Sequence, residues 1–248
     1  METAPRRLTF GAHADAYERA RPNWPEVVAR WFVPDDAKLV VELGAGTGKL
    51  TRAVAALGGR VVAVEPDPRM LAVLHDSGFE GVEGSAEAIP LDDGEADAIV
   101  AGSALHWFDL DAALPEIHRV LRPRGTFAFG WNHRDARHPT IARMSETIYA
   151  ARSEGTGWRS RGWPREVTEG GLFGDVEHEL FAHVHELPRE ALDDHLLSYA
   201  TLASLPEPER RRVFADVTEI LDADPSVRDG DRLRLPFVVE AYRATRVN

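Results

Sequence analysis

The sequence predicts an α/β fold: a doubly wound, mostly parallel sheet of seven strands with a C-terminal antiparallel strand pair and a helical lid insertion. Short apolar runs alternate with helical patterns through residues 38–131, which indicates βαβ units. The central residues of these runs are mostly apolar, without the alternation of a strand that has one face in water, as in strands that helices cover on both faces. A glycine-rich turn joins the first strand to the first helix, where open α/β sheets bind their ligands.

The first half of the chain supplies five strands in a regular order. A strand over 38–43 precedes a helix over 47–57, which ends at Gly58-Gly59 because glycine favours the residue after a helix. A strand over 60–65 and a helix over 68–75 follow. The remaining elements of this half are strands over 79–84 and 96–103, a helix over 109–121, a turn over 122–125 and a strand over 126–131.

The pattern changes after Asn132. Here the periodicity predicts a helix over 140–151, a strand over 176–186, helices over 189–202 and 207–221, and a last strand over 232–243. The two late strands form the expected antiparallel pair, and the helices between them form the expected lid. Trp131-Asn-His-Arg-Asp135 follows the fifth strand, so its polar groups are expected to face the ligand.

The composition excludes several classes of function. The 248 residues carry a formal net charge of −12 and no cysteine, which excludes disulfides, cysteine-bound metals and thiolate nucleophiles. Both halves of the chain are acidic, so we expect no nucleic-acid partner. No stretch approaches the roughly 18 apolar residues of a membrane span, and we expect a cytoplasmic protein with no membrane partner. His183 and His185 share a strand face without a third ligand, so no metal site is expected.

The glycine-rich turn carries the chemistry. Its glycines, Gly44, Gly46 and Gly48, do not fit the dinucleotide fingerprint, because Lys49 stands where the third glycine belongs. Glu42 before the turn would repel a pyrophosphate and would suit an ammonium group. Glu65 ends the second strand, where an acid can accept both hydroxyls of a ribose. Together these features predict a nucleoside ligand without phosphates.

Five motifs occur in order and at the expected distances, after a segment over residues 10–25 that belongs to the same pattern. The motifs are Glu42-Leu-Gly-Ala-Gly-Thr-Gly48, Val64-Glu-Pro-Asp-Pro-Arg-Met70, Gly84-Ser-Ala-Glu-Ala-Ile-Pro-Leu91, Ser103-Ala-Leu-His-Trp-Phe-Asp109 and Val120-Leu-Arg-Pro-Arg-Gly125. The pattern resembles the class I S-adenosylmethionine-dependent methyltransferases, specifically the small-molecule group similar to trans-aconitate methyltransferase. It departs from the commoner pattern at Ser85, where many relatives carry Asp. The resemblance implies a Rossmann-like methyltransferase fold that uses S-adenosyl-L-methionine.

We therefore expect residues 1–248 to form a single methyltransferase domain. Its parts are an N-terminal helical cap over 1–35, a cofactor-binding core over 36–132, and acceptor-side insertions and C-terminal strands over 133–248. The resemblance implies that the glycines surround the methionine part, Glu65 holds the ribose, Met70 packs on the adenine and Arg21 faces the cofactor carboxylate. The complete predicted set of cofactor residues is Tyr17, Arg21, Glu42, Gly44, Ala45, Gly46, Gly48, Glu65, Pro66, Met70, Ser85, Ala86, Glu87, Ser103 and His106.

The acceptor is predicted to be a small organic molecule methylated on a carboxylate or hydroxyl oxygen. The Asn/Asp-Pro-Pro-aromatic run of amino-methylating enzymes is absent after the fourth strand, and cytosine C5 methylation needs a cysteine. His106 is the candidate general base, because an imidazole titrates near neutral pH; alternatively, it hydrogen-bonds the loop that holds the cofactor. The predicted acceptor contacts are Tyr17, Trp24, Trp107 and Trp131.

Two other functions remain open from the sequence. An NAD(P)-dependent oxidoreductase would also have a glycine-rich turn, although Glu42 and the spacing at Gly48 count against it. A non-catalytic regulator that binds S-adenosylmethionine would share every cofactor residue. Neither the identity of the acceptor nor the oligomeric state follows from the sequence.

Overall fold

The computed structural model describes residues 21–151 and 162–248. Its strands form one sheet in the order β3-β2-β1-β4-β5-β8-β6, and β7 pairs with β8. Strands β1 to β5 are parallel, whereas β8 is antiparallel to both β5 and β6. The predicted C-terminal antiparallel pair is therefore confirmed. The bounds are β1 Leu39–Leu43, β2 Arg60–Glu65, β3 Gly81–Glu83, β4 Ala96–Gly102, β5 Leu121–Arg134, β6 Glu177–Pro188, β7 Arg228–Asp229 and β8 Arg232–Thr245.

The sheet has eight strands where seven were predicted, because the two-residue β7 adds an eighth. A pairing of two residues leaves no alternation of apolar and polar residues to detect. The predicted turn over 122–125 lies within β5, between the pairs Ala96–Leu121 and Ala98–Thr126. Arg124 adopts a φ of 64° there, so the turn exists as a bulge of the strand.

Every residue of β1 is buried, as predicted for a parallel strand covered on both faces. Val41 and Leu43 join the apolar cluster under α5 (Leu110–Val120) and α7 (Trp163–Thr168). Val40 joins the cluster on the opposite face, under α2 (Glu26–Phe32) and α3 (Lys49–Ala55). Helix α4 (Pro68–Asp76) packs beside β2 and β3. Apolar side chains on both faces of this sheet therefore fix the carboxyl ends of its parallel strands.

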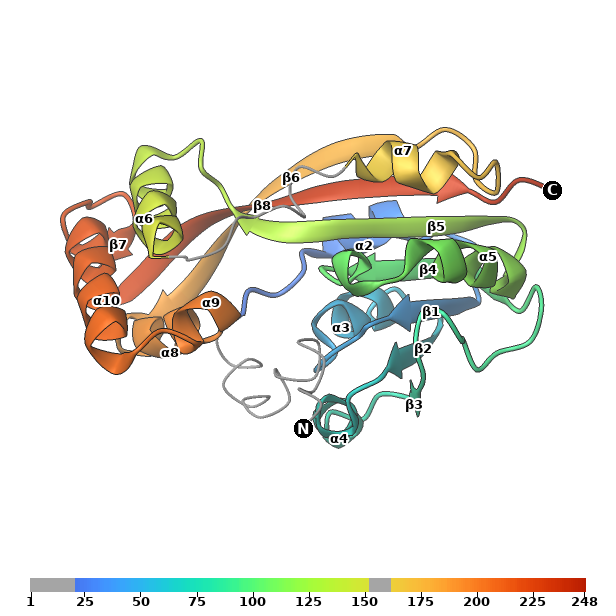
Figure 1. Cartoon of the computed structure of the whole chain (residues 1–248), viewed down its shortest axis with the longest axis horizontal. Helices are drawn as coiled ribbons and strands as arrows, with labels where there is room; N and C mark the ends of the chain where they lie inside the picture. Colours follow the sequence, from blue (N-terminus) through green and yellow to red (C-terminus); the bar gives the residue numbers. More distant parts are fainter. Residues whose placement is uncertain (1–20, 152–161) are drawn as a thin grey trace.

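The remaining helices form a separate layer with their own apolar cluster. They are α6 (Pro139–Ala150), α8 (Leu192–Leu197), α9 (Ala200–Ala203) and α10 (Glu207–Asp222). Figure 1 shows them gathered at one end of the molecule, around the end of β5 from which α6 follows. This arrangement agrees with the predicted lid. None of the helices in the described residues is long and apolar enough to cross a bilayer.

The prediction of one helix over 189–202 is wrong. The segment contains the 3-10 turn η5 (Arg189–Ala191), then α8 and α9, which are separated by Ser198 and Tyr199. The Ser198 carbonyl accepts a hydrogen bond from the Arg21 guanidinium at 2.9 Å, while the Leu202 N–H donates to Tyr199. Helix α7 was not predicted, because its six residues are too few for a periodic pattern.

Candidate functional site

The carboxyl ends of β1, β2, β4 and β5 bring the predicted motifs together. The Gly44 N–H donates to the Val64 carbonyl at 2.9 Å, which holds the turn after β1 against the end of β2. The Ser103 N–H donates to the Gly130 carbonyl at 2.8 Å, which joins the ends of β4 and β5. Residues that are far apart in the sequence therefore line one edge of the sheet.

The glycine-rich turn has the backbone that its sequence predicts. Gly44, Gly46 and Gly48 adopt φ values of 66°, 58° and 87°, in the left-handed region that favours glycine. A Cβ atom on Gly44 would lie 2.8 Å from the Cβ of Ala104, so this turn is packed against the segment after β4. A Cβ atom on Gly46 would meet no atom of residues 21–151 or 162–248 within 4 Å. The turn therefore leaves space beside Gly46 at the positions predicted to surround the methionine part.

Glu65 lies beside this turn with both carboxylate oxygens oriented. Its Oε2 accepts from the Gly46 N–H at 2.8 Å, and its Oε1 accepts from the Asp67 N–H at 2.9 Å. Burial raises the pKa of Glu65, and the two backbone N–H groups oppose this effect. A carboxylate held at the end of β2 next to a glycine-rich turn suits recognition of a ribose diol.

Glu42 is the second predicted acid, and it is fully buried below the turn. The Thr51 hydroxyl of α3 donates to its Oε2 at 2.5 Å. Burial is the main cause that raises the pKa of Glu42 to about 8. The group is therefore protonated at neutral pH, although the sequence predicted a carboxylate. A cation beside it would favour the ionised form.

The predicted adenine residues come from two segments. Met70 on α4 and Ala86 after β3 are both buried, while Pro66 is half-buried at the start of the α4 segment. Ser85 forms a β-bridge with Ala88, which gives the segment a tight turn.

Glu87 closes this region against the next helix. Its Oε1 accepts from the N–H of Asp109, the residue that precedes α5. This interaction gives Glu87 a structural partner, and its predicted contact with the adenine edge stays a prediction.

His106 lies in the 3-10 turn η3 (Leu105–Trp107) after β4. Its Nδ1 accepts from the Trp131 indole N–H at 3.1 Å. Since an indole nitrogen only donates, the neutral imidazole carries its proton on Nε2. Burial lowers the pKa of His106 to about 4. The geometry therefore favours a neutral hydrogen-bond donor at Nε2 over the predicted general base.

The predicted tryptophans differ in exposure. Trp107 is 39% exposed and its ring lies 4.7 Å from that of His106. Trp131 is buried and packs on the Trp163 ring of α7 at 5.1 Å. Trp24 is buried against Phe32, with ring centroids 6.0 Å apart. Trp24 and Trp131 are therefore packed inside the protein, whereas Trp107 presents surface beside His106, and the acceptor contacts predicted for all three stay predictions.

Two predicted residues come from the start of the chain. Tyr17 lies outside the described residues. Arg21 donates to the Ser198 carbonyl and stacks on Tyr199, with its guanidinium carbon 4.2 Å from the ring centroid. In this structure Arg21 contacts the α8–α9 segment, and its predicted role toward the cofactor carboxylate stays a prediction.

The structure adds residues that sequence reasoning missed. Thr51 donates a hydrogen bond to Glu42. The sequence indicated only that Thr51 lies in the helix after the glycine-rich turn, which does not identify this partner. Tyr199 lies at the break between α8 and α9, inside the stretch that was predicted as one helix. Ser103 was predicted as a cofactor residue, but its φ of 55° is not revealed by a sequence pattern. In the part of the chain that the structure describes, no group of three His, Asp or Glu side chains could hold a metal ion.

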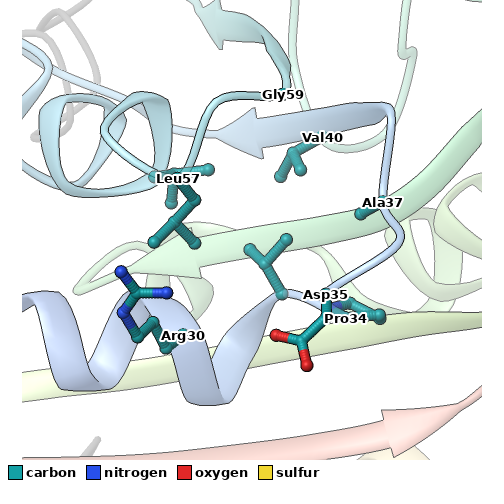
Figure 2. Close-up of a pocket in the computed structure, with 9 residues that line it drawn as sticks. Arg30, Pro34, Asp35, Ala37, Val40, Leu57 and Gly59 are labelled. Carbon is teal, nitrogen blue, oxygen red and sulfur yellow. The ribbon is translucent and has the colours of Figure 1, made fainter.

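A small cavity of about 80 Å³ lies elsewhere, between α2 and the turn after α3. Figure 2 shows Arg30, Val40, Leu57 and Gly59 around it. Val40 and Gly59 are near the amino ends of β1 and β2, away from the carboxyl ends that carry the predicted motifs. No predicted site residue lines this cavity.

Comparisons with known proteins identify the family. A family model described as "Methyltransferase domain" matches residues 41–129. An uncharacterized methyltransferase of Mycobacterium tuberculosis is 37% identical over 240 residues, which cover 96% of each chain. A structure from Anaeromyxobacter dehalogenans, described as a candidate type II methyltransferase, superposes with a TM-score of 0.65 at 23% identity and covers 91% of this chain and 97% of its own.

A further solved structure contains the product of the cofactor. It is a Haemonchus contortus phosphoethanolamine N-methyltransferase in complex with S-adenosylhomocysteine, with a TM-score of 0.57 at 15% identity, covering all of this chain and 62% of its own. These low identities support the fold alone, whereas the M. tuberculosis relative matches along almost the whole chain. The match to this methyltransferase decides against the alternative of an NAD(P)-dependent oxidoreductase. This chain belongs to the class I S-adenosylmethionine-dependent methyltransferases.

Proposed function

We propose that this methyltransferase acts on a small organic acceptor and methylates a carboxylate oxygen. The observation that carries the proposal is the hydrogen bond from Trp131 to His106 Nδ1, which leaves the neutral imidazole with its proton on Nε2. An N–H donor suits an acceptor oxygen. It does not suit an ammonium group, which has only donors of its own.

The low pKa of His106 separates the two predicted oxygen acceptors. With a pKa of about 4, this imidazole is a weak base at neutral pH. A hydroxyl has to lose a proton during methyl transfer, but a carboxylate is already ionised at neutral pH. The carboxylate is therefore the acceptor that needs no general base. The sequence motifs of this chain resemble those of the group similar to trans-aconitate methyltransferase, and this resemblance supports methylation of a carboxylate.

The residues around the glycine-rich turn fit the cofactor. Gly46 leaves open space that a larger residue would narrow, and the Glu65 carboxylate has the place of a ribose partner. Glu42 would hold the cofactor ammonium group once ionised, and Met70 would pack on the adenine. When bound, S-adenosylmethionine would supply a methyl group on its sulfonium sulfur. The acceptor oxygen would bond to this methyl carbon in line as the carbon–sulfur bond breaks and the thioether leaves. The protein's own contribution is alignment, worth up to about 7 to 11 kcal/mol in well-oriented systems.

The charges of the reacting groups also favour this acceptor. A carboxylate and a sulfonium react to give a neutral ester and a neutral thioether, so the opposite charges are partly neutralised in the transition state and vanish in the products. A partly buried site that excludes water favours such a loss of charge over the separated ions. His106 Nε2–H would orient the carboxylate oxygen that is not methylated.

The test uses tritiated S-adenosylmethionine with matched small carboxylic acids, alcohols and amines. We expect label to enter the carboxylic acids and to be released as methanol by mild alkali, because esters hydrolyse where ethers and N-methyl groups do not. Alkali-stable label would overturn the carboxylate assignment. Binding of S-adenosylhomocysteine without turnover across the panel would support the non-catalytic regulator instead.

Glu65→Ala in the same assay tests the cofactor site. We expect S-adenosylhomocysteine affinity to fall at least about tenfold, because a charge-assisted hydrogen bond contributes about 1.5–3 kcal/mol. Glu80→Ala is the matched control, since Glu80 is an exposed carboxylate that pairs with Arg60. Equal affinities of the Glu65 variant and wild type would contradict the ribose role.

A further inference from the structure

Strand β6 forms an open edge of the sheet. Within residues 21–151 and 162–248, the 12 residues of β6 pair with β8 alone and in one unbroken register. Figure 1 shows β6 running along β8 from the side of α7 toward the lid helix α8. Proteins commonly protect such an edge with a bulge, a lysine or an internal proline. Strand β6 contains neither a bulge nor a lysine, and its only proline, Pro188, ends the strand.

The even-numbered residues of β6 turn their backbone N–H and C=O groups to the open edge. The Leu180 N–H donates to the Glu179 carboxylate at 3.1 Å, so it does not point toward β8. Arg189, an odd-numbered residue that continues the register, donates its N–H to the Asp231 carbonyl at 2.7 Å, on the side of β8. Because these groups alternate along a strand, Ala182 points its own in the same direction as Leu180. The open edge can therefore accept another strand.

The side chains of these even-numbered residues form a row on one face of the sheet. Leu180 is 46% exposed, Val184 is 47% exposed, and Ala182 lies exposed between them. His178 and Glu186 occupy the two ends of the row and are also exposed. An apolar centre with a polar rim is typical of a surface that binds another protein.

This row is complementary to itself when two copies of β6 lie antiparallel. With Ala182 of one copy opposite Ala182 of the other, Leu180 lies opposite Val184 of the second copy, so apolar side chains meet. His178 lies opposite Glu186 of the second copy, and an imidazole N–H can donate to a carboxylate. A two-fold axis relates the two copies, so each of these pairs occurs twice.

The opposite face of β6 fits the same register. Glu179 is exposed and His185 is half-buried on that face. In the register centred on Ala182, Glu179 lies opposite His185 of the second copy, so a carboxylate and an imidazole meet on this face as well.

Neighbouring registers fit less well. A shift of the centre by one residue toward the N-terminus sets His178 against Val184 of the second copy. A shift by one residue toward the C-terminus sets Leu180 against Glu186 of the second copy. Either shift places an apolar side chain opposite a polar one, so the centre at Ala182 is the favoured register.

Both end residues of the row also have partners within their own copy. The Glu186 Oε1 lies 3.2 Å from the Arg234 Nε, and the His178 Nε2 lies 3.5 Å from the Glu240 Oε1. All four side chains are at least a third exposed, so the charged pairs add specificity and little affinity. The apolar centre and the backbone hydrogen bonds supply most of the affinity.

We propose that two copies of this chain pair through β6 about a two-fold axis at Ala182, which joins their two sheets into one. The partner is a second copy because the exposed row of β6 matches itself in both side-chain type and backbone direction. Once β6 meets β6, this edge is used in both copies, so the assembly closes as a dimer. The inference is independent of the acceptor that the enzyme methylates.

Analytical ultracentrifugation of the purified full chain tests the dimer. We expect wild type to show an equilibrium of monomer and dimer that depends on concentration. Ala182→Glu sets two carboxylates opposite each other at the axis, so we expect the dissociation constant of the dimer to rise at least about tenfold. Ala72→Glu is the matched control, since Ala72 is an exposed alanine of α4, beside the opposite edge of the sheet. Circular dichroism shows whether each variant is folded.

Single cysteines then test the register, because the chain has no cysteine of its own. Leu180→Cys and Val184→Cys are mixed, allowed to exchange subunits and mildly oxidised. We expect a disulfide between the two variants, because Cα atoms of directly opposite residues lie about 5.5 Å apart. Each variant alone should cross-link much less, since its two cysteines are offset by four residues, or about 13 Å along the strands.

Four outcomes would overturn the proposal. Wild type that stays monomeric at every concentration reached excludes the dimer. A dimer that a folded Ala182→Glu variant forms as well as wild type does lies at another surface. Open-ended oligomers that Ala182→Glu disrupts mean that β6 pairs with a different strand of the second copy. Cross-linking of each cysteine variant with itself, in preference to the mixed pair, excludes the register at Ala182, and this measurement decides alone if Ala182→Glu does not fold.

Discussion

Gly44 and Gly46 both have positive φ values, but only Gly44 lies against another chain segment. A Cβ atom on Gly44 would approach the Cβ of Ala104 to 2.8 Å, whereas one on Gly46 would meet no atom of the described part of the chain within 4 Å. Gly46→Ala therefore adds only left-handed backbone strain, worth about 1–2 kcal/mol. We expect Gly44→Ala to lower the free energy of unfolding by more than that amount, because a steric overlap is added to the same strain.

Urea unfolding of the two variants measures this difference. Gly58→Ala is a control for the strain alone, since Gly58 also has a positive φ and open space around its Cα but lies away from the site. Equal stability losses at Gly44 and Gly46 would show that the turn is not packed against the segment after β4.

Glu42 makes the stability of the protein depend on pH. Its pKa is raised from 4.5 to about 8, chiefly by burial. Between these values the folded protein keeps a proton that the unfolded chain releases, so the free energy of unfolding falls as pH rises, by up to about 1.4 kcal/mol per pH unit. The stabilisation that comes from the protonated Glu42 is completely lost above about pH 8. Glu42→Gln removes this dependence, because the amide stays neutral and its oxygen still accepts from Thr51.

The measurement is urea unfolding of wild type and Glu42→Gln at several pH values from 5 to 8. We expect wild type to lose stability relative to the variant as pH rises. Other titrating groups, including Glu65, are present in both proteins and largely cancel in the difference. A difference that stays constant across this range would contradict a protonated Glu42.

At the residue scale, sequence reasoning predicted the backbone of the glycine-rich turn but not the states of the acid and imidazole groups near it. The spacing of Gly44, Gly46 and Gly48 was sufficient to predict the turn, because only glycine adopts these φ values easily. The protonation of Glu42 and the tautomer of His106 depend on Thr51 and Trp131, which the fold brings to them. A linear pattern contains neither the burial nor the hydrogen bond that sets these states.

At the element scale, the parallel half and the lid helices α6 and α10 were predictable, and the break between α8 and α9 was not. Strands β1 and β4 are mostly apolar runs with one acidic residue each, so local composition is enough to identify them. The break between α8 and α9 has a different origin. The Ser198 carbonyl accepts from Arg21, a residue 177 positions earlier in the chain. Local periodicity cannot report a contact over that separation, so the prediction merged α8 and α9 into one helix.

The long antiparallel strands show the same limit. The prediction ended the fifth strand at residue 131, yet β5 continues to Arg134 because β8 pairs with it up to Phe237. The last three residues of β5 are polar and half-buried, so hydropathy gave no reason to extend the strand. Those residues are Asn132, His133 and Arg134, which belong to the polar run that was predicted to follow the fifth strand.

At the scale of the whole molecule, β8 makes the fold cooperative. The last strand of the chain lies between β5 and β6, so the core of the first half contains residues from the C-terminus. Val239 is fully buried in the same apolar cluster as Val40, Val100 and Phe32. The matched family segment, residues 41–129, thus lacks part of the apolar core beneath its own sheet.

Val239→Asp tests this dependence. A buried and unpaired carboxylate in β8 is expected to lower the free energy of unfolding by about 4 kcal/mol or more. Because β8 pairs with β5, the loss reaches the strand that positions Trp131 and Asn132, and S-adenosylhomocysteine binding should disappear with the folded state. Val238→Asp is the matched control, since the Val238 side chain is half-buried and lies on the opposite face of β8 from Val239.

Urea unfolding and calorimetry with S-adenosylhomocysteine measure both effects on the same samples. We expect one cooperative transition for wild type and Val238→Asp, and for Val239→Asp a transition at much lower urea or no folded baseline. A Val239→Asp protein that still binds S-adenosylhomocysteine with wild-type affinity would mean that the parallel half folds without β8. The cofactor site would then be independent of β8. In that case β8 would stabilise only the end of β5 that lies next to the lid helix α6.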